Sequence, residues 1–343
     1  MTLQVVPLTA DREQAYSAFV EAHPAALISY TLAYRDLLVE LLGCSPRYGV
    51  ALRDDVVVAV MPVMSLDGDR GLVLNALPYF GSNGGPLAAD AAADEALRAW
   101  FVAEAQAEGV LAATVIDNPL ARPSASLIGD LCDVRVGHVT TLTGEGEPHA
   151  RIRAAIDGSA RRNVAKAQRC GTRVAVENDQ RGLDELQSLH RRSMEAIGVQ
   201  VKEPRFFAAV ARIFRSGTDF DVYVARIEEE AVAALLVFYC GRTVDYYVPA
   251  VDPEYRSEQP MAAILVQAMS DAAGRGFAHW NWGGSWPSNE SLQRFKAKWG
   301  GVRCEYGYAT TLNDRDVLDA RPEDLLAAYP GFFVVPFSYL ATA

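Results

Sequence analysis

The order of predicted elements occurs twice along the chain, and this repetition most constrains the fold. Each half predicts a helical opening, an antiparallel hairpin, then a helix followed by a strand. In the first half these elements cover 30–42, 48–52 with 56–64, 94–108 and 111–116. In the second half they cover 184–196 with 205–215, 222–228 with 231–240 and 243–249, 259–275 and 279–282. The sequence therefore predicts two related α/β (α+β) domains.

Chain length favours the same division, because 343 residues are more than one ordinary hydrophobic core accommodates. The segment 140–149 is rich in Thr, Gly, Glu and Pro, which is typical of a linker. We therefore predict one domain over 1–145 and a second over 150–343.

Composition excludes several classes of protein. A net charge of -11 opposes a general nucleic-acid coat protein, although a local basic patch can still bind phosphate. No signal-peptide pattern opens the chain, and the longest apolar run, 231–240, is about half of the roughly 20 residues that a spanning helix needs. The five cysteines are scattered and the five histidines form no close pair. We expect a cytoplasmic protein with reduced thiols, no metal and no membrane-spanning segment.

The segment 251–265 follows a predicted strand and opens a helix, where unpaired N–H groups favour a phosphate or carboxylate. Its V-x-P-x-[YF]-R pattern, which ends at Arg256, resembles the acyl-CoA-binding segment of GNAT acyltransferases. That family has two glycines after the arginine, and this chain has Gln259 and Met261 at the matching places. Both side chains are expected to crowd the approach that glycine permits. The alternative is a plain strand-to-helix turn with a surface arginine.

The segment 280–301 resembles the C-terminal signature of Fem-type peptidyltransferases. Its F-K-x-x-[FW]-G motif is present as Phe295, Lys296, Trp299 and Gly300, and the turn before it as Gly283, Gly284 and Ser285. The resemblance implies that Lys296 stabilises the developing negative charge of an acyl-transfer intermediate. The alternative is an amphipathic helix that Lys296 and Lys298 simply flank.

A basic helix is predicted over 151–173, in a chain that is acidic overall. Its S-x-R-R-N-V-x-K pattern resembles the entry of the second domain in Fem-type proteins. Arg161, Arg162 and Lys166 form a candidate patch for the phosphates of a tRNA or of a nucleotide-linked acceptor. The alternative is a solvated helix that supports the domain junction.

Other candidates are less specific. The Gly-rich loop 79–86 resembles a small-residue loop of related proteins and either lines an acceptor cleft or forms a surface turn. Asp245 and Tyr247 alternate along one predicted strand, so they are expected on one side of the sheet, where either could deprotonate or orient an amine. Tyr255 is a candidate proton donor to a leaving group.

The resemblance to GNAT and Fem-type proteins implies two GNAT-like domains, each a mixed, mainly antiparallel sheet flanked by helices. The domain over 1–145 would take the acceptor and the domain over 150–343 the acyl donor. The implied reaction is N-acyl transfer from acyl-CoA or an aminoacyl-tRNA to a small-molecule or cell-envelope amine, by direct attack. A non-catalytic binding protein with the same fold, or a tRNA- or nucleotide-binding accessory factor, are the alternatives.

Overall fold

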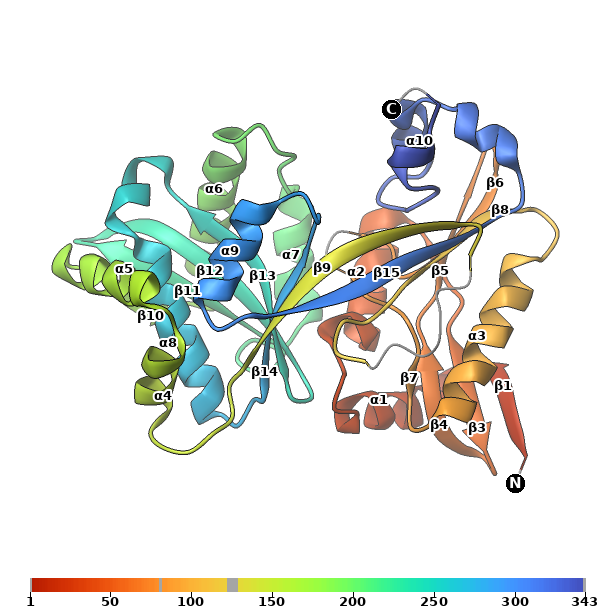
Figure 1. The fold of residues 1–343 in the computed structure, drawn as a ribbon, viewed down its shortest axis with the longest axis horizontal. Helices are drawn as coiled ribbons and strands as arrows, with labels where there is room; N and C mark the ends of the chain where they lie inside the picture. Colours follow the sequence, from red (N-terminus) through yellow and green to blue (C-terminus); the bar gives the residue numbers. More distant parts are fainter. Residues whose placement is uncertain (1, 80–81, 122–128, 342–343) are drawn as a thin grey trace. The chain divides into compact units, whose positions relative to one another are not determined.

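The computed structural model describes residues 2–79, 82–121 and 129–341. The chain divides into two compact units, Met1–Val136 with Glu305–Ala343, and Gly137–Cys304 (Figure 1). This differs from the predicted division into 1–145 and 150–343, because residues 305–343 group with the first unit. Strand pairing explains the difference: Tyr308 to Leu312 of the C-terminal segment pair antiparallel with Ile116 to Ala112.

The first unit contains two sheets. One has the strand order β1-β3-β4-β7 and is antiparallel, and the other includes the order β15-β8-β6-β5-β2, in which only β6 and β8 are parallel. The strands are β1 (Leu3–Pro7), β2 (Ser45–Pro46), β3 (Gly49–Arg53), β4 (Val56–Met61), β5 (Met64–Gly68), β6 (Gly71–Ala76), β7 (Leu87–Ala88), β8 (Val110–Ile116) and most of β15 (Val302–Leu312). The helices are α1 (Glu13–Ala22), α2 (Leu32–Leu42), α3 (Ala91–Ala105) and α10 (Pro322–Ala328).

Local sequence signals set the limits of α2. The Thr31 hydroxyl accepts the Tyr34 N–H at 3.2 Å and caps the start of the helix. Gly43 ends the helix in the left-handed region, at φ 64°, where glycine carries no side-chain penalty. The predicted helix over 30–42 and its glycine stop are confirmed, with the start two residues later.

The second unit contains the strand order β10-β11-β12-β13-β14, in which the first four strands are antiparallel and β14 is parallel to β13. Helices α6 and α7 cover one face, and α8 with α4 and α5 covers the other (Figure 1). The strands are β10 (Arg173–Val176), β11 (Phe220–Ile227), β12 (Glu230–Cys240), β13 (Thr243–Val251) and β14 (His279–Ser285). The helices are α4 (Pro148–Ala155), α5 (Gly158–Arg169), α6 (Gln180–Glu195), α7 (Pro204–Ile213), α8 (Pro260–Gly274) and α9 (Glu290–Lys298).

Side chains alternate along β12, so this strand packs against helices on both faces of the sheet. Leu235 and Val237 are fully buried in a hydrophobic cluster with residues of α8. The same cluster includes Trp280 and Trp282 of β14. The ring of Phe238 instead lies 4.8 Å from that of Phe214, at the end of α7. The expected mixed, mainly antiparallel sheet flanked by helices is therefore present.

The predicted basic helix over 151–173 is wrong as a single element. It is two helices, α4 and α5, and Arg173 begins β10. The Asp157 carboxylate accepts the Ala160 N–H at 2.7 Å, so it caps a new helix start instead of continuing the old one. Of the predicted linker 140–149, residues 140–141 end β9 (Leu131–Thr141), residues 148–149 begin α4, and the whole segment lies within the second unit.

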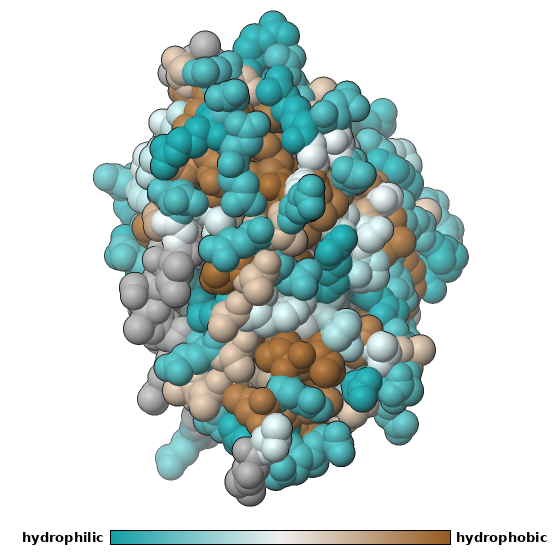
Figure 2. Space-filling view, turned by 90° about the vertical axis from the view of Figure 1, so that its right-hand side faces the viewer, coloured by the Kyte–Doolittle hydropathy of each residue, from teal (hydrophilic) through white to brown (hydrophobic). Residues whose placement is uncertain are grey.

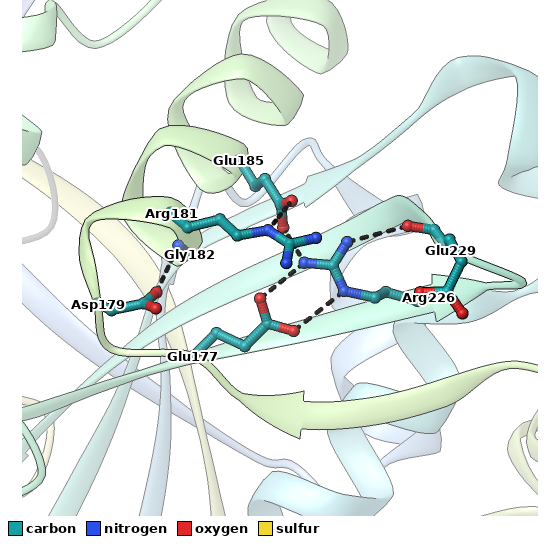
Figure 3. A network of polar contacts seen from close by, with 7 residues as sticks. All are labelled: Glu177, Asp179, Arg181, Gly182, Glu185, Arg226 and Glu229. Atoms are coloured by element: carbon teal, nitrogen blue, oxygen red, sulfur yellow. Dashed lines mark hydrogen bonds and ion pairs between the residues drawn. The ribbon is translucent and has the colours of Figure 1, made fainter.

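A network of charged side chains holds the start of α6 to β11 (Figure 3). Arg226 of β11 donates to both carboxylate oxygens of Glu177, at 3.0 and 2.7 Å, and to Glu185. The chain turns tightly between Glu177 and Gly182, because a side chain at Gly182 would place its Cβ 1.9 Å from the Glu177 carbonyl oxygen. The network and the glycine together position α6 in the second unit.

On the face shown in Figure 2, hydrophobic residues form patches that hydrophilic ones separate. Over the described ranges, no helix has both the length and the apolar character that crossing a membrane requires.

Candidate active site

Strands β13 and β14 run side by side for only a short distance. Their parallel pairing covers three positions, from Thr243 opposite His279 to Asp245 opposite Asn281. Both strands continue beyond this point, β13 to Val251 and β14 to Ser285. The pairing therefore ends within the second unit at Asp245 and Asn281, and the later backbone groups of the two strands are not bonded to each other.

Lys296 lies at the end of β14, although it belongs to α9. Its Nζ donates to the carbonyl oxygens of Gly283, at 2.8 Å, and Gly284, at 3.1 Å. The side chain is buried, with 2% exposure, and burial lowers its pKa to about 8. The three predicted site residues Lys296, Gly283 and Gly284 thus meet. A buried amine bonded to two backbone carbonyls is not the flanking lysine of the alternative interpretation.

Asn281 joins this group to Asp245. Its Nδ2 donates to the Asp245 carboxylate at 2.8 Å, and its Oδ1 accepts the Gly283 N–H at 3.0 Å. A hydrogen-bonded series therefore runs from Asp245 through Asn281 and Gly283 to Lys296. Sequence reasoning missed Asn281. The available signal was an asparagine two residues before a glycine, a spacing at which the side chain bonds the backbone of its own turn.

Gly283 has φ 67°, a left-handed conformation that favours glycine. A Cβ built on it meets no atom within 4 Å. The turn is therefore open beside the position to which Lys296 is bonded. Ser285, the next predicted residue, is buried at the end of the same strand.

Tyr247 lies in an aromatic cluster under α7. Its ring is stacked on Phe206 with centroids 6.0 Å apart and meets Phe238 edge-on at 4.9 Å. Lys202 Nζ lies 4.8 Å from the Phe206 ring and 5.4 Å from the Tyr247 ring, and burial lowers the pKa of Lys202 to about 8. Its backbone N–H donates to Nε2 of His190 in α6. The sequence did not single out this lysine or this histidine.

Comparison with known proteins shows which fold this chain resembles. Residues 154–296 match the family of acetyltransferase (GNAT) domains. FemX has a TM-score of 0.68 over 89% of this chain and 96% of its own, at 15% identity. The chain has a GNAT-like, Fem-type fold.

Two further solved structures show the same fold. The C-terminal domain of a putative lysylphosphatidylglycerol synthetase from Agrobacterium fabrum has a TM-score of 0.60 over 95% of this chain and 99% of its own, at 15% identity. A tandem GNAT protein from the clavulanic acid biosynthesis pathway has a TM-score of 0.50 over 90% of this chain and 98% of its own, at 10% identity. No curated protein sequence matches this chain.

The GNAT-like turn between β13 and α8 is a short helix, η3 (Pro253–Glu258), followed by Gln259. Gln259 has φ 63°, so it occupies a left-handed position that glycine adopts more readily. Its Nε2 donates to the Arg256 carbonyl at 2.8 Å. Met261 is partly buried and packs against the core of the unit. The sequence predicted that both side chains would crowd a ligand. It did not indicate the hydrogen bond of Gln259 or the packing of Met261.

The remaining predicted residues of this turn have separate surroundings. Arg256 is exposed. The Tyr255 hydroxyl donates to Glu230 at 2.8 Å, and this bond and partial desolvation raise its pKa. Asp252 is buried, caps η3 through the Glu254 N–H, and pairs with Arg192 of α6. Tyr255 is therefore bonded to an acidic side chain within the same unit.

The basic residues on α5 differ in their surroundings. Arg161 donates to the Ile156 carbonyl at 2.6 Å and supports the break between α4 and α5. Arg162, Lys166 and Arg169 are exposed, and none has an ion pair or a side-chain hydrogen bond with any residue that the structure describes. Their charges are available to a solvent-borne anion.

The Gly-rich loop 79–86 of the first unit is not a surface turn where the structure describes it. Ser82 and Asn83 are each 3% exposed, and Asn83 donates to the Asp117 carbonyl at 2.7 Å. Residues 80–81 lie outside the described residues. Among the residues that are described, no group of three or more His, Cys, Asp or Glu side chains could hold a metal ion.

Proposed function

We propose that this protein transfers an acyl or aminoacyl group from a thioester, such as acyl-CoA, or from an aminoacyl-tRNA to an amine. The observation that carries the proposal is the buried amine of Lys296, bonded to the Gly283 and Gly284 carbonyls where β13 and β14 are no longer paired. A positive charge in a dry, preorganised place is what a developing oxyanion requires.

The reaction would proceed by direct attack, without a covalent enzyme intermediate. A neutral amine forms a bond to the donor carbonyl carbon, and the carbonyl electron pair moves to oxygen, where the third N–H of the Lys296 ammonium stabilises it. The intermediate then expels the thiolate or the tRNA hydroxyl. Tyr247 is the candidate to receive the proton that the amine loses, and Tyr255 is the candidate to protonate the leaving group.

Donor phosphates would bind near the start of α8. The N-terminal end of a helix carries a partial positive charge, and exposed Arg256 precedes it. Arg162 and Lys166 on α5 extend the positive charge of the same unit, and α5 contacts η3. A tRNA donor would use both groups, whereas a CoA donor needs only the first.

The unpaired basic side chains on α5 also favour a second candidate, a tRNA- or nucleotide-binding accessory factor without transfer activity. Such a factor would bind its ligand with strong salt dependence, because each neutralised phosphate releases counterions. It would lose binding when Arg162 and Lys166 are replaced by glutamine, and it would be indifferent to Lys296.

The test titrates the purified protein with acetyl-CoA and with charged tRNA, then measures transfer to a panel of amines by mass spectrometry. We expect one donor to bind, and Lys296→Met to lower the transfer rate by about 10²-fold or more. Lys298→Met is the matched control, since Lys298 is exposed on the same helix. Binding of neither donor, or equal rates for Lys296→Met and the wild type, would reject the proposal.

A further inference from the structure

A carboxylate such as that of Asp245 can act as a base, but its place in the second unit supports another role. Its carboxylate accepts a hydrogen bond from Asn281, and both residues are buried, with 7% and 4% exposure. They face each other at the last paired position of β13 and β14. Any effect of Asp245 that passes through this hydrogen bond therefore reaches the other group that Asn281 binds.

Asn281 holds the turn that binds Lys296. Its side-chain oxygen accepts the Gly283 N–H, and the carbonyl of the same Gly283 accepts from Lys296 Nζ. Gly283 is in the left-handed region, so its peptide groups have a direction that the strand alone would not impose. Fixing the N–H of this residue restrains the turn whose carbonyls Lys296 binds.

We propose that Asn281 is a positioning residue that couples the Asp245 carboxylate to the Gly283 turn and thereby holds Lys296 in place. The inference rests on the proposed function for its meaning in catalysis, but the coupling itself is a property of the folded chain. Asp245 then serves as an acceptor for Asn281 and not as the base.

Four variants separate these roles. Asn281→Ala removes both links. Asp245→Asn keeps an oxygen that accepts from Asn281 but cannot act as a base. Asn281→Asp sets two carboxylates against each other, and combining it with Asp245→Asn restores a donor and an acceptor in the reverse order.

The chain offers a matched control of the same chemistry. Asn178 donates to the Asp221 carboxylate at 2.7 Å and accepts the Val222 N–H at 2.8 Å, so it also links a carboxylate to a backbone N–H in the second unit. Neither contact involves Lys296. Asn178→Ala therefore reports the general cost of losing such a link.

The first readout needs no substrate. Trace labelling with acetic anhydride across a pH series, followed by peptide mass spectrometry, gives the titration midpoint of Lys296 in the folded chain. We expect the midpoint to rise by about one unit in Asn281→Ala and Asn281→Asp, as the released amine becomes hydrated. It should stay at the wild-type value in Asp245→Asn, in the double variant and in Asn178→Ala. Equal midpoints in Asn281→Ala and Asn178→Ala would overturn the proposal.

The second readout is the transfer rate, once a donor and an acceptor are found. We expect Asn281→Ala to lower the rate about tenfold, and the double variant to recover most of that loss. Asp245→Asn should keep most of the wild-type rate, so its inactivity would overturn the positioning role. If no transfer is found at all, the proposed function fails while the labelling experiment still tests the coupling.

Discussion

Each unit of this protein has a pair of adjacent glycines near the end of a strand, and the two pairs do different things. In the first unit, a Cβ on Gly84 would lie 2.2 Å from the Ala76 carbonyl oxygen. Gly84 and Gly85 both donate their N–H groups to the Ile116 carbonyl, at 2.9 Å each. Gly84 is required because two backbone segments pass too close together for a side chain there, whereas a Cβ on Gly85 would only come within 3.1 Å of the Asp117 side chain.

In the second unit, a Cβ on Gly283 meets nothing within 4 Å, and the carbonyls of Gly283 and Gly284 bind a buried lysine. Here the glycine is required by its left-handed backbone and not by crowding. A Gly-Gly signature therefore has two physical causes, close packing in the first unit and an open, left-handed turn in the second. Only at Gly283 is there open space beside the glycine.

The largest effect should come from Gly84→Ala. The new Cβ meets the backbone of Ala76, which cannot rotate away as a side chain could, so we expect about 3 kcal/mol of destabilisation. Urea unfolding followed by circular dichroism measures it. A loss below about 1 kcal/mol would mean that the first-unit pair is not held by packing and that the comparison fails.

A second prediction uses the pH dependence of stability. The pKa of Lys296 is about 8 in the folded protein, against an ordinary value of 10.5. Between these values the unfolded chain binds the extra proton, so stability contributed by this group rises with pH. We expect the wild type to gain about 2 kcal/mol relative to Lys296→Met between pH 8 and pH 10.

The measurement is the free energy of unfolding at several pH values, with Lys298→Met as the control. Lys202 has a similarly lowered pKa, so it contributes to the rise in both proteins and cancels in the difference. Parallel curves for the wild type and Lys296→Met would show that the second-unit glycines do not hold a desolvated amine.

Gly283→Ala should have a smaller effect than Gly84→Ala. Because the added Cβ has open space, the cost is only that of a left-handed alanine, about 1 kcal/mol. The same urea experiment measures it, and the ratio of the two costs is the sharpest test of the comparison. Equal costs would indicate that crowding governs both turns.

The sequence predicted the second unit better than the first for a physical reason. The hairpin predicted over 222–228 and 231–240 is β11 and β12, and the helix predicted over 259–275 is α8. These elements consist of long apolar runs and are buried, so the sequence pattern identifies them. In the first unit, the strand predicted over 56–64 is interrupted after Met61, and the hairpin of β5 and β6 was missed. Pro62 stands at that interruption and is the signal that was available.

The long strands β9 and β15 were missed because their apolar alternation is weak. Residues Val302 to Glu305 at the start of β15 include exposed positions and two charges, so local periodicity does not indicate a strand. The candidate site shows the same limit. The motif identified Lys296 and the glycines, and the spacing of Asn281 and Gly283 indicates their local bond, but the link from Asn281 to Asp245 depends on strand pairing, which no local pattern contains.

The smallest expected effect belongs to Gln259→Gly, which places a glycine at another left-handed position. Glycine relieves the left-handed strain at φ 63° but loses the hydrogen bond from Gln259 to the Arg256 carbonyl and gains freedom in the unfolded chain. These effects oppose each other, so we expect stability to change by less than about 0.5 kcal/mol.

Because the side chain of Gln259 is already bonded to the Arg256 carbonyl, we also expect the affinity of Gln259→Gly for acetyl-CoA, measured by calorimetry, to change less than about threefold. Met261→Ala is the control, since it removes a core contact without changing the left-handed residue. A gain in affinity of tenfold or more would show that Gln259 blocks the phosphate approach, and the η3 turn would then resemble the open Gly283 turn with its glycine replaced.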